Sequence, residues 1–150
     1  MALVSRRPAL EELVREMNEA VFRVTKGDKF ITFFVARYDT SARILHYVNA
    51  GHIPPFMIMD GVITTLRNGA TSLGWLPQLP FLELGEVKIS SEALIFTFTD
   101  GLTEARNSHG EEFGEERLAS FLKEHEKDDP ETLNSRRCTG CPVHAPDHRD

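Results

Sequence analysis

The spacing of the apolar residues changes at Phe30, and this change constrains the fold more than any other feature of the chain. Between Pro8 and Val24 the apolar side chains recur at helical intervals, and they are Leu10, Leu13, Val14, Met17 and Val21. From Phe30 onward, short β-branched and aromatic runs alternate with turns, which is typical of strands. We therefore expect one amphipathic helix packed against a mainly antiparallel sheet.

Six strands are expected after this helix, with ranges 30–38, 44–48, 56–59, 62–66, 83–89 and 93–99. Asp60-Gly61, between the third and the fourth, predicts a hairpin because both residues accept the positive φ of a tight turn. The first strand is apolar on both faces, so we expect it to be covered on both sides. The last is predicted to be a central strand. Gly85 indicates a bulge, residues 68–80 indicate a loop, and residues 114–124 indicate a helix.

Composition and charge exclude several classes of function. The 150 residues carry a net charge of −6, which disfavours general binding to nucleic acids or to an anionic membrane, since both need a basic face. No apolar run approaches the roughly 20 residues that span a bilayer, and no targeting segment is recognised at the N-terminus. The only two cysteines are Cys138 and Cys141. A disulfide framework is therefore not expected, and the cytoplasm is the expected compartment.

The last part of the chain, Lys127 to Asp150, differs from the rest because it is rich in Pro, Asp, Arg and His and poor in apolar residues. We expect a domain over 1–126 and a disordered tail over 127–150. The tail also holds four potential ligands for tetrahedral zinc, namely Cys138, Cys141, His144 and His148. The loop between the two pairs is shorter than in usual zinc modules, and two prolines oppose a helix. We favour the tail without metal.

A carboxylate follows the last expected strand directly, in Thr99-Asp100-Gly101. Mg²⁺ and Mn²⁺ prefer anionic oxygen ligands that are held on rigid elements, and an Asp at a strand end meets this requirement. The same residues are also consistent with a simple turn, because Asp-Gly is a common turn pair.

A second turn, Asn49-Ala50-Gly51-His52, follows the strand expected over 44–48. Asn and Gly both accept positive φ, which predicts a tight turn here. His52 is either a ligand or proton donor, or a turn histidine that is hydrogen-bonded to the backbone, which is the more common case.

The motifs in their order resemble metal-dependent (PPM-type) serine/threonine phosphatase domains of the stage II sporulation protein E family. The matching segments are Asn49-Ala50-Gly51-His52-x-Pro54-Pro55, then Leu73-Gly74, then Thr99-Asp100-Gly101-Leu102-Thr103-Glu104-Ala105-Arg106-Asn107, then Phe113-Gly114. Each motif is weak alone, and the order of the four carries the resemblance. It extends from Phe30 to about Leu122 and corresponds to the C-terminal part of such a domain.

The resemblance implies an α+β fold, in which an antiparallel β-sandwich is flanked by helices and holds two Mn²⁺ or Mg²⁺ ions. In that family a metal-bound water attacks the phosphorus of a phosphoserine or phosphothreonine. Asp100 matches an aspartate that ligates metal. Asn49, Gly51 and His52 match a family signature without an assigned ligand role. Glu104 matches a further family position, where supporting the ligands or starting a helix is as plausible as direct ligation.

The sequence also departs from the family pattern. Before Phe30 nothing matches the Gly-Asp and Gly-His-Gly segments that supply further metal ligands. Asp128-Asp129-Pro130-Glu131-Thr132 resembles the final Asp-Asp-x-Thr segment, but its place directly behind the expected helix fits the start of a further helix better, with Pro130 and Glu131 in its first turn. We therefore expect an incomplete domain with one metal ligand, Asp100.

Two functions follow as alternatives. The first is a phosphatase that acts on a phosphorylated protein in bacterial signalling, for example an anti-anti-sigma factor. The second is a catalytically inactive, truncated phosphatase fold that acts as a binding module or is a fragment. An unpaired sheet edge would in either case favour self-association.

Overall fold

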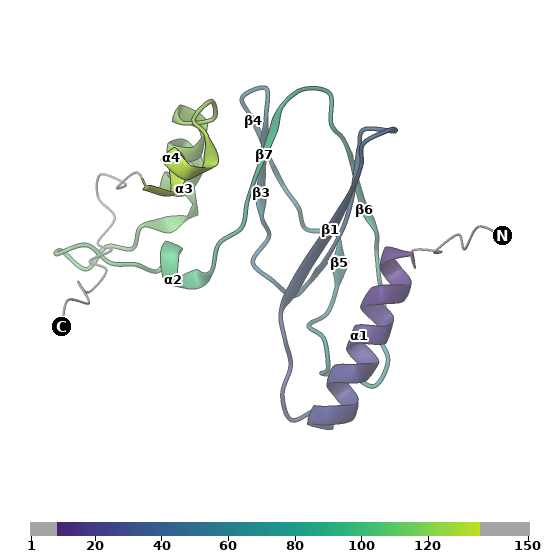
Figure 1. Cartoon of the computed structure of the whole chain (residues 1–150). Helices are drawn as coiled ribbons and strands as arrows, with labels where there is room; N and C mark the ends of the chain where they lie inside the picture. The colour runs from purple at the N-terminus through teal and green to yellow at the C-terminus, as the bar shows by residue number, and fades with distance from the viewer. Residues whose placement is uncertain (1–8, 136–150) are drawn as a thin grey trace, which may run out of the picture. The chain divides into compact units, whose positions relative to one another are not determined.

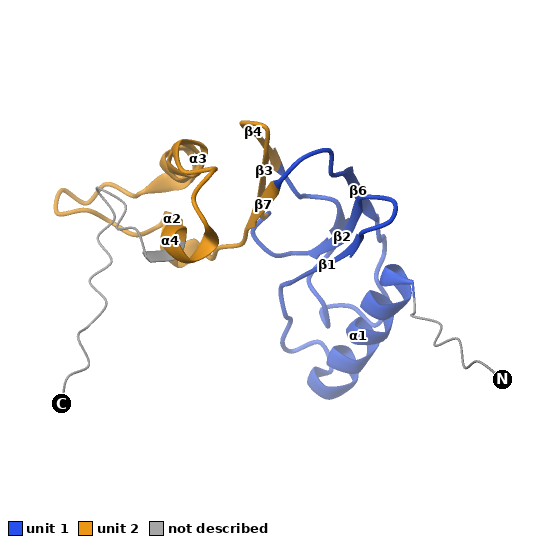
Figure 2. Ribbon diagram, turned by 45° about the horizontal axis from the view of Figure 1, so that its top comes forward, with its two compact units in different colours: residues 1–54, 65–92 blue, residues 55–64, 93–150 orange. Residues whose placement is uncertain are grey.

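The computed structural model describes residues 9–135 and separates the chain into two compact units (Figure 2). Unit 1 comprises residues 1–54 and 65–92, and unit 2 comprises residues 55–64 and 93–150. The elements, shown in Figure 1, are α1 (Leu10–Thr25), β1 (Phe33–Asp39), β2 (Ile44–Ala50), β3 (Phe56–Met59), β4 (Val62–Thr65), β5 (Gly69–Ala70), β6 (Gly85–Lys88), β7 (Ala93–Phe96), α2 (Asp100–Thr103), α3 (Gly114–Glu124) and α4 (Pro130–Ser135).

Unit 1 is a helix packed on a four-stranded sheet. β2 is the central strand, because it pairs antiparallel with β1 and β6 and parallel with the two residues of β5. The buried apolar core joins α1, β2 and the segment after β4, and consists of Leu10, Val14, Val48, Ala50, Ala70, Leu73 and Leu79. The helix and the strands expected around it are thus confirmed, whereas β5 falls inside the segment expected to be a loop.

α1 has the signals that its sequence predicts. Glu11 and Glu12 occupy its first turn, where negative charge interacts favourably with the helix dipole. The helix ends at Lys26, which has a left-handed backbone (φ 54°) and donates its N–H to the Phe22 carbonyl. Its buried stripe includes Val14 and, one turn later, the polar residue Asn18.

Two expectations about unit 1 are wrong. The residues of β1 are half-buried or exposed rather than covered on both faces, because the one helix described in this unit covers only one face of the sheet. Gly85 is not a bulge, since β6 pairs with β2 in continuous register with Gly85 opposite Tyr47. A Cβ at Gly85 would lie 2.2 Å from the Tyr47 ring. The glycine therefore leaves space for a buried aromatic side chain.

Unit 2 contains a three-stranded sheet in the order β4-β3-β7, together with α2, α3 and α4. Asp60 and Gly61 join β3 to β4 with φ values of 52° and 75°, as expected for a tight hairpin turn. The carboxylate of Glu126 accepts a hydrogen bond from the Gly61 N–H at 2.9 Å. Buried apolar residues of the strands and helices form its interior, namely Phe56, Met57, Ile58, Phe98, Phe113, Leu118, Leu122 and Leu133.

The prediction that residues 93–99 form a central strand is wrong for the described part of the chain. β7 ends at Phe96 and pairs antiparallel with β3, which is its only strand partner among residues 9–135. It is therefore an edge strand, and Ile95 is 37% exposed. The apolar run alone did not show whether the strand lies at the edge or in the centre of its sheet, because only the number of neighbouring strands decides this.

α4 lies inside the segment that was expected to be a loose tail. Asp129 caps the helix through hydrogen bonds from the Thr132 N–H and hydroxyl to its carboxylate, and Leu133 is buried. The helix start predicted at Pro130 and Glu131 is confirmed. The expectation that disorder begins at Lys127 is wrong for the residues up to Leu133. The domain boundary after Glu126 stays a prediction. The four potential zinc ligands, Cys138, Cys141, His144 and His148, lie outside the described residues.

The Asp129 cap predicts a pH dependence for α4. The hydrogen bonds from the Thr132 hydroxyl and then from backbone N–H groups lower the pKa of Asp129 below its ordinary value of 3.8. A lowered pKa means that the cap contributes stability above pH 3.8, and that this contribution is lost as the pH falls through the folded pKa. In an NMR titration we expect the Thr132 amide to shift at a midpoint below pH 3.8 in the wild type. Asp129→Ala should abolish this shift, and an identical titration in that variant would contradict the cap.

No helix in residues 9–135 is long and apolar enough to cross a membrane.

Candidate functional site

Asp100 begins the short helix α2 just beyond β7. Thr99 before it is extended (φ −113°, ψ 165°), so the backbone turns from strand to helix at this point. The Asp100 side chain is exposed, and its Oδ1 accepts a hydrogen bond from the Gly101 N–H at 2.9 Å. No other hydrogen bond or ion pair of this carboxylate is found within residues 9–135. It therefore retains oxygen lone pairs that can bind a cation.

Glu104 follows one turn later, at the C-terminal end of α2. Its N–H donates to the Asp100 carbonyl at 2.8 Å, and its side chain is exposed. The two carboxylates therefore share one short element of unit 2. No three His, Cys, Asp and Glu side chains in the described part of the chain form a group that could hold a metal ion.

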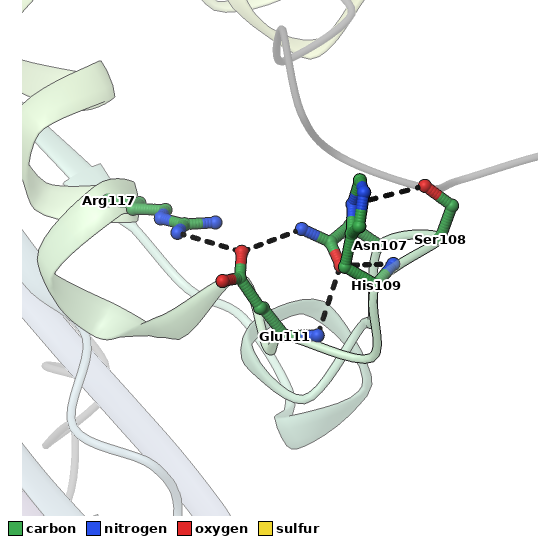
Figure 3. Close-up of polar contacts among 5 residues, drawn as sticks. All are labelled: Asn107, Ser108, His109, Glu111 and Arg117. Carbon is green, nitrogen blue, oxygen red and sulfur yellow. Dashed lines mark hydrogen bonds and ion pairs between the residues drawn. The ribbon is translucent and has the colours of Figure 1, made fainter.

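The segment after α2 is a polar loop that begins at Asn107, the last residue of the Asp100 motif (Figure 3). Asn107 Oδ1 accepts hydrogen bonds from the N–H groups of His109 and Glu111, and its Nδ2 donates to the Glu111 carboxylate. Arg117 on α3 lies 3.7 Å from the same carboxylate. In this structure Asn107 therefore organises the loop, and Glu111 joins the loop to α3 through Arg117.

Asn49 and His52 lie in unit 1, where β2 ends. Asn49 is 5% exposed, and its Nδ2 donates to the Leu66 carbonyl at 3.2 Å. Its Oδ1 accepts the His52 N–H at 2.8 Å. Both ends of the amide are thus used to hold the turn, and Asn49 has a structural role here.

The His52 ring is half-buried, with its Nδ1 2.7 Å from the carbonyl oxygen of Ile53. A carbonyl only accepts hydrogen bonds, so Nδ1 is the donor in this contact. Gly51, between Asn49 and His52, has φ 70°, and a Cβ there would lie 2.2 Å from Ser72 Oγ. The geometry matches a turn histidine that is bonded to the backbone.

Within each unit the structure brings two of the four predicted site residues together. Asp100 and Glu104 lie on α2 in unit 2, and Asn49 and His52 lie in one turn of unit 1.

Asn18 is a buried polar residue that sequence reasoning missed. It is 1% exposed and donates from Nδ2 to the Leu76 carbonyl at 3.1 Å, while its Oδ1 accepts the Gly74 N–H at 2.9 Å. Its signal in the sequence was a polar residue four positions after Val14, on the buried stripe of α1. Asn18 gives the Leu73-Gly74 motif a structural role, because it ties that loop to the helix.

A hollow of about 330 Å³ lies in unit 2 between β7 and α4. Its lining is mostly apolar and includes Leu94, Phe96, Pro130 and Leu133, and Glu131 is its one charged residue. Asp100 is not part of this lining. The hollow therefore offers no ligand set for a metal or a phosphate.

The metal expected from the sequence can be tested against these residues. Asp100 fits a hard divalent cation, because it is an exposed carboxylate on a backbone set by strand and helix. A pair of such ions needs several ligands, and residues 9–135 offer no group of three. The described residues therefore supply one element of a metal centre and do not complete it.

Comparison with known proteins identifies the family and the fold of this chain. The model of the family "Stage II sporulation protein E (SpoIIE)" matches residues 1–144. Protein IcfG of Synechocystis sp. is 34% identical over 94 residues, which make up 62% of this chain and 15% of that protein. The chain thus spans a small part of this curated relative.

Two solved structures are similar. The SiaA-PP2C domain of Pseudomonas aeruginosa has a TM-score of 0.56 and 24% identity, covering 69% of this chain and 41% of that one. The phosphatase domain of the cell fate determinant SpoIIE from Bacillus subtilis has a TM-score of 0.52 and 12% identity, covering 89% and 71%. These likenesses confirm the expected α+β fold of PP2C-type phosphatase domains.

Proposed function

Because this chain belongs to the stage II sporulation protein E family, we propose that it serves the metal-dependent removal of phosphate from a phosphoserine or phosphothreonine of a partner protein. The observation that carries this proposal is Asp100, an exposed carboxylate at the junction of β7 and α2, inside the family motif. In this proposal Asp100 binds one Mn²⁺ or Mg²⁺ ion. Glu104, one turn away, supports Asp100 or the substrate rather than binding the ion itself.

The partner in this proposal is a phosphorylated protein of bacterial signalling, such as an anti-anti-sigma factor, and the compartment is the cytoplasm. The support for the partner is the family, and the support for the compartment is the cysteine content of the sequence. Neither partner nor compartment enters the experiments below, which use the metal and a small phosphate ester.

A second function, a catalytically inactive binding module, is favoured by one observation. The described residues supply one suitable carboxylate and no group of three potential ligands. The two functions differ in whether this chain alone can turn over a phosphate ester.

The first prediction of this proposal tests Asp100 as a ligand. Substoichiometric Mn²⁺, which is paramagnetic, should broaden the amide signals of Gly101 and Leu102 in NMR spectra of the wild type. Asp100→Asn keeps the size of the side chain and removes the charge, so it should abolish this broadening. Asp60→Asn is the matched control, because Asp60 is also an exposed aspartate followed by glycine, and it should leave the broadening at Gly101 unchanged. Equal broadening in wild type and Asp100→Asn would contradict the metal assignment.

The second prediction concerns turnover. We expect the 150-residue chain to hydrolyse p-nitrophenyl phosphate in excess Mn²⁺ no faster than its Asp100→Ala variant, since one carboxylate does not hold a metal pair. The measurement is the rate of nitrophenolate release with and without Mn²⁺. Strong Mn²⁺-dependent turnover that Asp100→Ala abolishes would instead exclude the inactive module and establish the enzyme.

A further inference from the structure

Unit 1 exposes a cluster of large apolar side chains near the C-terminal end of α1. The cluster consists of Phe30, Ile31, Trp75 and Leu76, which are 60%, 49%, 60% and 40% exposed, and is called the Trp75 surface below. Single exposed apolar residues are normal in proteins. Exposed apolar residues that lie together and are rimmed by polar residues mark interaction sites.

The backbone under the Trp75 surface is held in place. Ile31 and Leu73 exchange two backbone hydrogen bonds of 2.9 Å, which join the segment before β1 to the loop after β5. The ring centroids of Phe30 and Trp75 are 6.3 Å apart. Asn18 on α1 binds the Leu76 carbonyl. A large aromatic side chain on a backbone that is already held in place loses less entropy on binding than one on a mobile loop, which suits Trp75 as an anchor for a partner.

Basic residues border the Trp75 surface. Arg23, Lys26 and Lys29 are exposed at the end of α1 and in the turn that follows, and Asp28 in the same turn is the one acidic residue among residues 23–29, which leaves this border with an excess of positive charge. Gly27, inside this turn, adjoins the loop, since a Cβ there would lie 3.6 Å from the Trp75 carbonyl oxygen. None of the three cations forms an ion pair within residues 9–135. They are therefore available to a partner, in a chain whose net charge is −6.

We propose that the Trp75 surface binds an acidic segment of a partner protein. The segment places an apolar side chain against Trp75, and its carboxylates face Arg23, Lys26 and Lys29. Charge complementarity of this kind selects the partner and speeds the encounter. The inference concerns binding alone and holds whether or not the chain turns over a phosphate ester.

Two other occupants fit the surface less well. Segments that bind anionic membranes typically carry a cluster of roughly four to eight Lys and Arg residues, whereas three border this surface in an acidic chain. A second copy of this chain, seated surface to surface, would bring two identical sets of cations together, and like charges across an interface disfavour binding.

The experiment uses the intrinsic fluorescence of the full chain, because Trp75 is its only tryptophan. The probe is a synthetic amphipathic peptide without tryptophan, in which glutamates flank leucine and phenylalanine. A second peptide has lysine in place of each glutamate. We expect the acidic peptide to shift Trp75 emission to shorter wavelength and to protect it from acrylamide, with saturation. Its affinity should fall about tenfold when salt rises to about 0.3 M, because the cations are exposed and screened.

Charge reversal in the protein supplies the matched test. The Lys26→Glu, Lys29→Glu double variant should bind the acidic peptide about tenfold more weakly, which corresponds to about 1.4 kcal/mol. The Arg67→Glu, Lys88→Glu double variant is the control. It changes the net charge of the chain by the same amount, at exposed basic residues outside the Trp75 surface. It should therefore retain most of the affinity for the acidic peptide. Fluorescence of each free variant reports whether the surroundings of Trp75 are preserved.

Four results would overturn the proposal. One is the absence of any shift with the acidic peptide, and another is an equal shift with the lysine peptide. A shift with phosphatidylglycerol vesicles alone would assign the surface to membranes. A shift with protein concentration alone would assign it to a second copy of this chain.

Discussion

Gly69→Ala is expected to destabilise unit 1 by about 3 kcal/mol or more, because the added methyl group has no space. Gly69 pairs in parallel register with Asn49 of β2. A Cβ at Gly69 would lie 1.8 Å from the Asn49 carbonyl oxygen and 2.6 Å from its amide nitrogen. These neighbours are backbone atoms of a central strand, so they cannot rotate away. The substitution must separate β5 from β2 and displace the Asn49–His52 turn.

The measurement is urea unfolding followed by far-UV circular dichroism, which reports on both units, and by Trp75 fluorescence, which reports on unit 1. Gly101→Ala is the control, since Gly101 has no positive φ and a Cβ there would make an ordinary contact, 3.7 Å from Thr99 Oγ1. It should unfold with wild-type stability or slightly above, because alanine favours a helix over glycine. A Gly69→Ala free energy of unfolding within about 0.5 kcal/mol of wild type would contradict the close approach of the two strands.

Asn18→Leu is expected to cost about 2–4 kcal/mol, although leucine has a higher helix propensity and a similar size. The buried Asn18 amide accepts a hydrogen bond from the Gly74 N–H and donates to the carbonyls of Leu76 and Pro77. Leucine would leave these backbone groups without partners, and an unsatisfied buried polar group costs about 1–3 kcal/mol. The loop that carries Trp75 should therefore loosen even where α1 stays helical.

Two observations check this role. Hydrogen exchange of the Gly74 amide should accelerate strongly in Asn18→Leu, and the free energy of unfolding should fall. Glu19→Leu, at the exposed neighbouring position, introduces the same side chain and should change stability by about 0.5 kcal/mol or less. Equal stability of the two variants would show that the Asn18 hydrogen bonds contribute nothing net.

Local patterns were sufficient for most elements. The helical spacing from Leu10 predicted α1, and Asp60-Gly61 predicted the hairpin with both φ values positive, as found. The motif order predicted the family and the α+β fold, both confirmed by the comparisons. The metal-ligand role of Asp100 was predicted from the motif and stays a prediction, whereas its exposure at a strand–helix junction is observed.

Patterns failed where a residue's role depends on partners far along the chain. β1 was expected to be covered on both faces and β7 to be central, because an apolar run records the character of a strand and not what packs on it or beside it. Gly85 was read as a bulge, although the Tyr47 ring opposite it requires the space. The tail was expected to be loose, yet Leu133 is buried.

The sequence by itself determined the order and type of most elements, all but β5 and α2, together with the family and the candidate ligand Asp100, since spacing, turn residues and motif order are properties of adjacent residues. Only the tertiary structure decided what the motif residues do. In the folded chain Asn49 forms hydrogen bonds with the Leu66 carbonyl and the His52 N–H. Asn18 forms hydrogen bonds with a loop that lies 56 to 59 residues further along the chain. The tertiary structure also sets Trp75 beside Phe30 on an exposed surface. The physical reason is that hydrogen-bond satisfaction and burial depend on atoms that meet only when distant segments pack together.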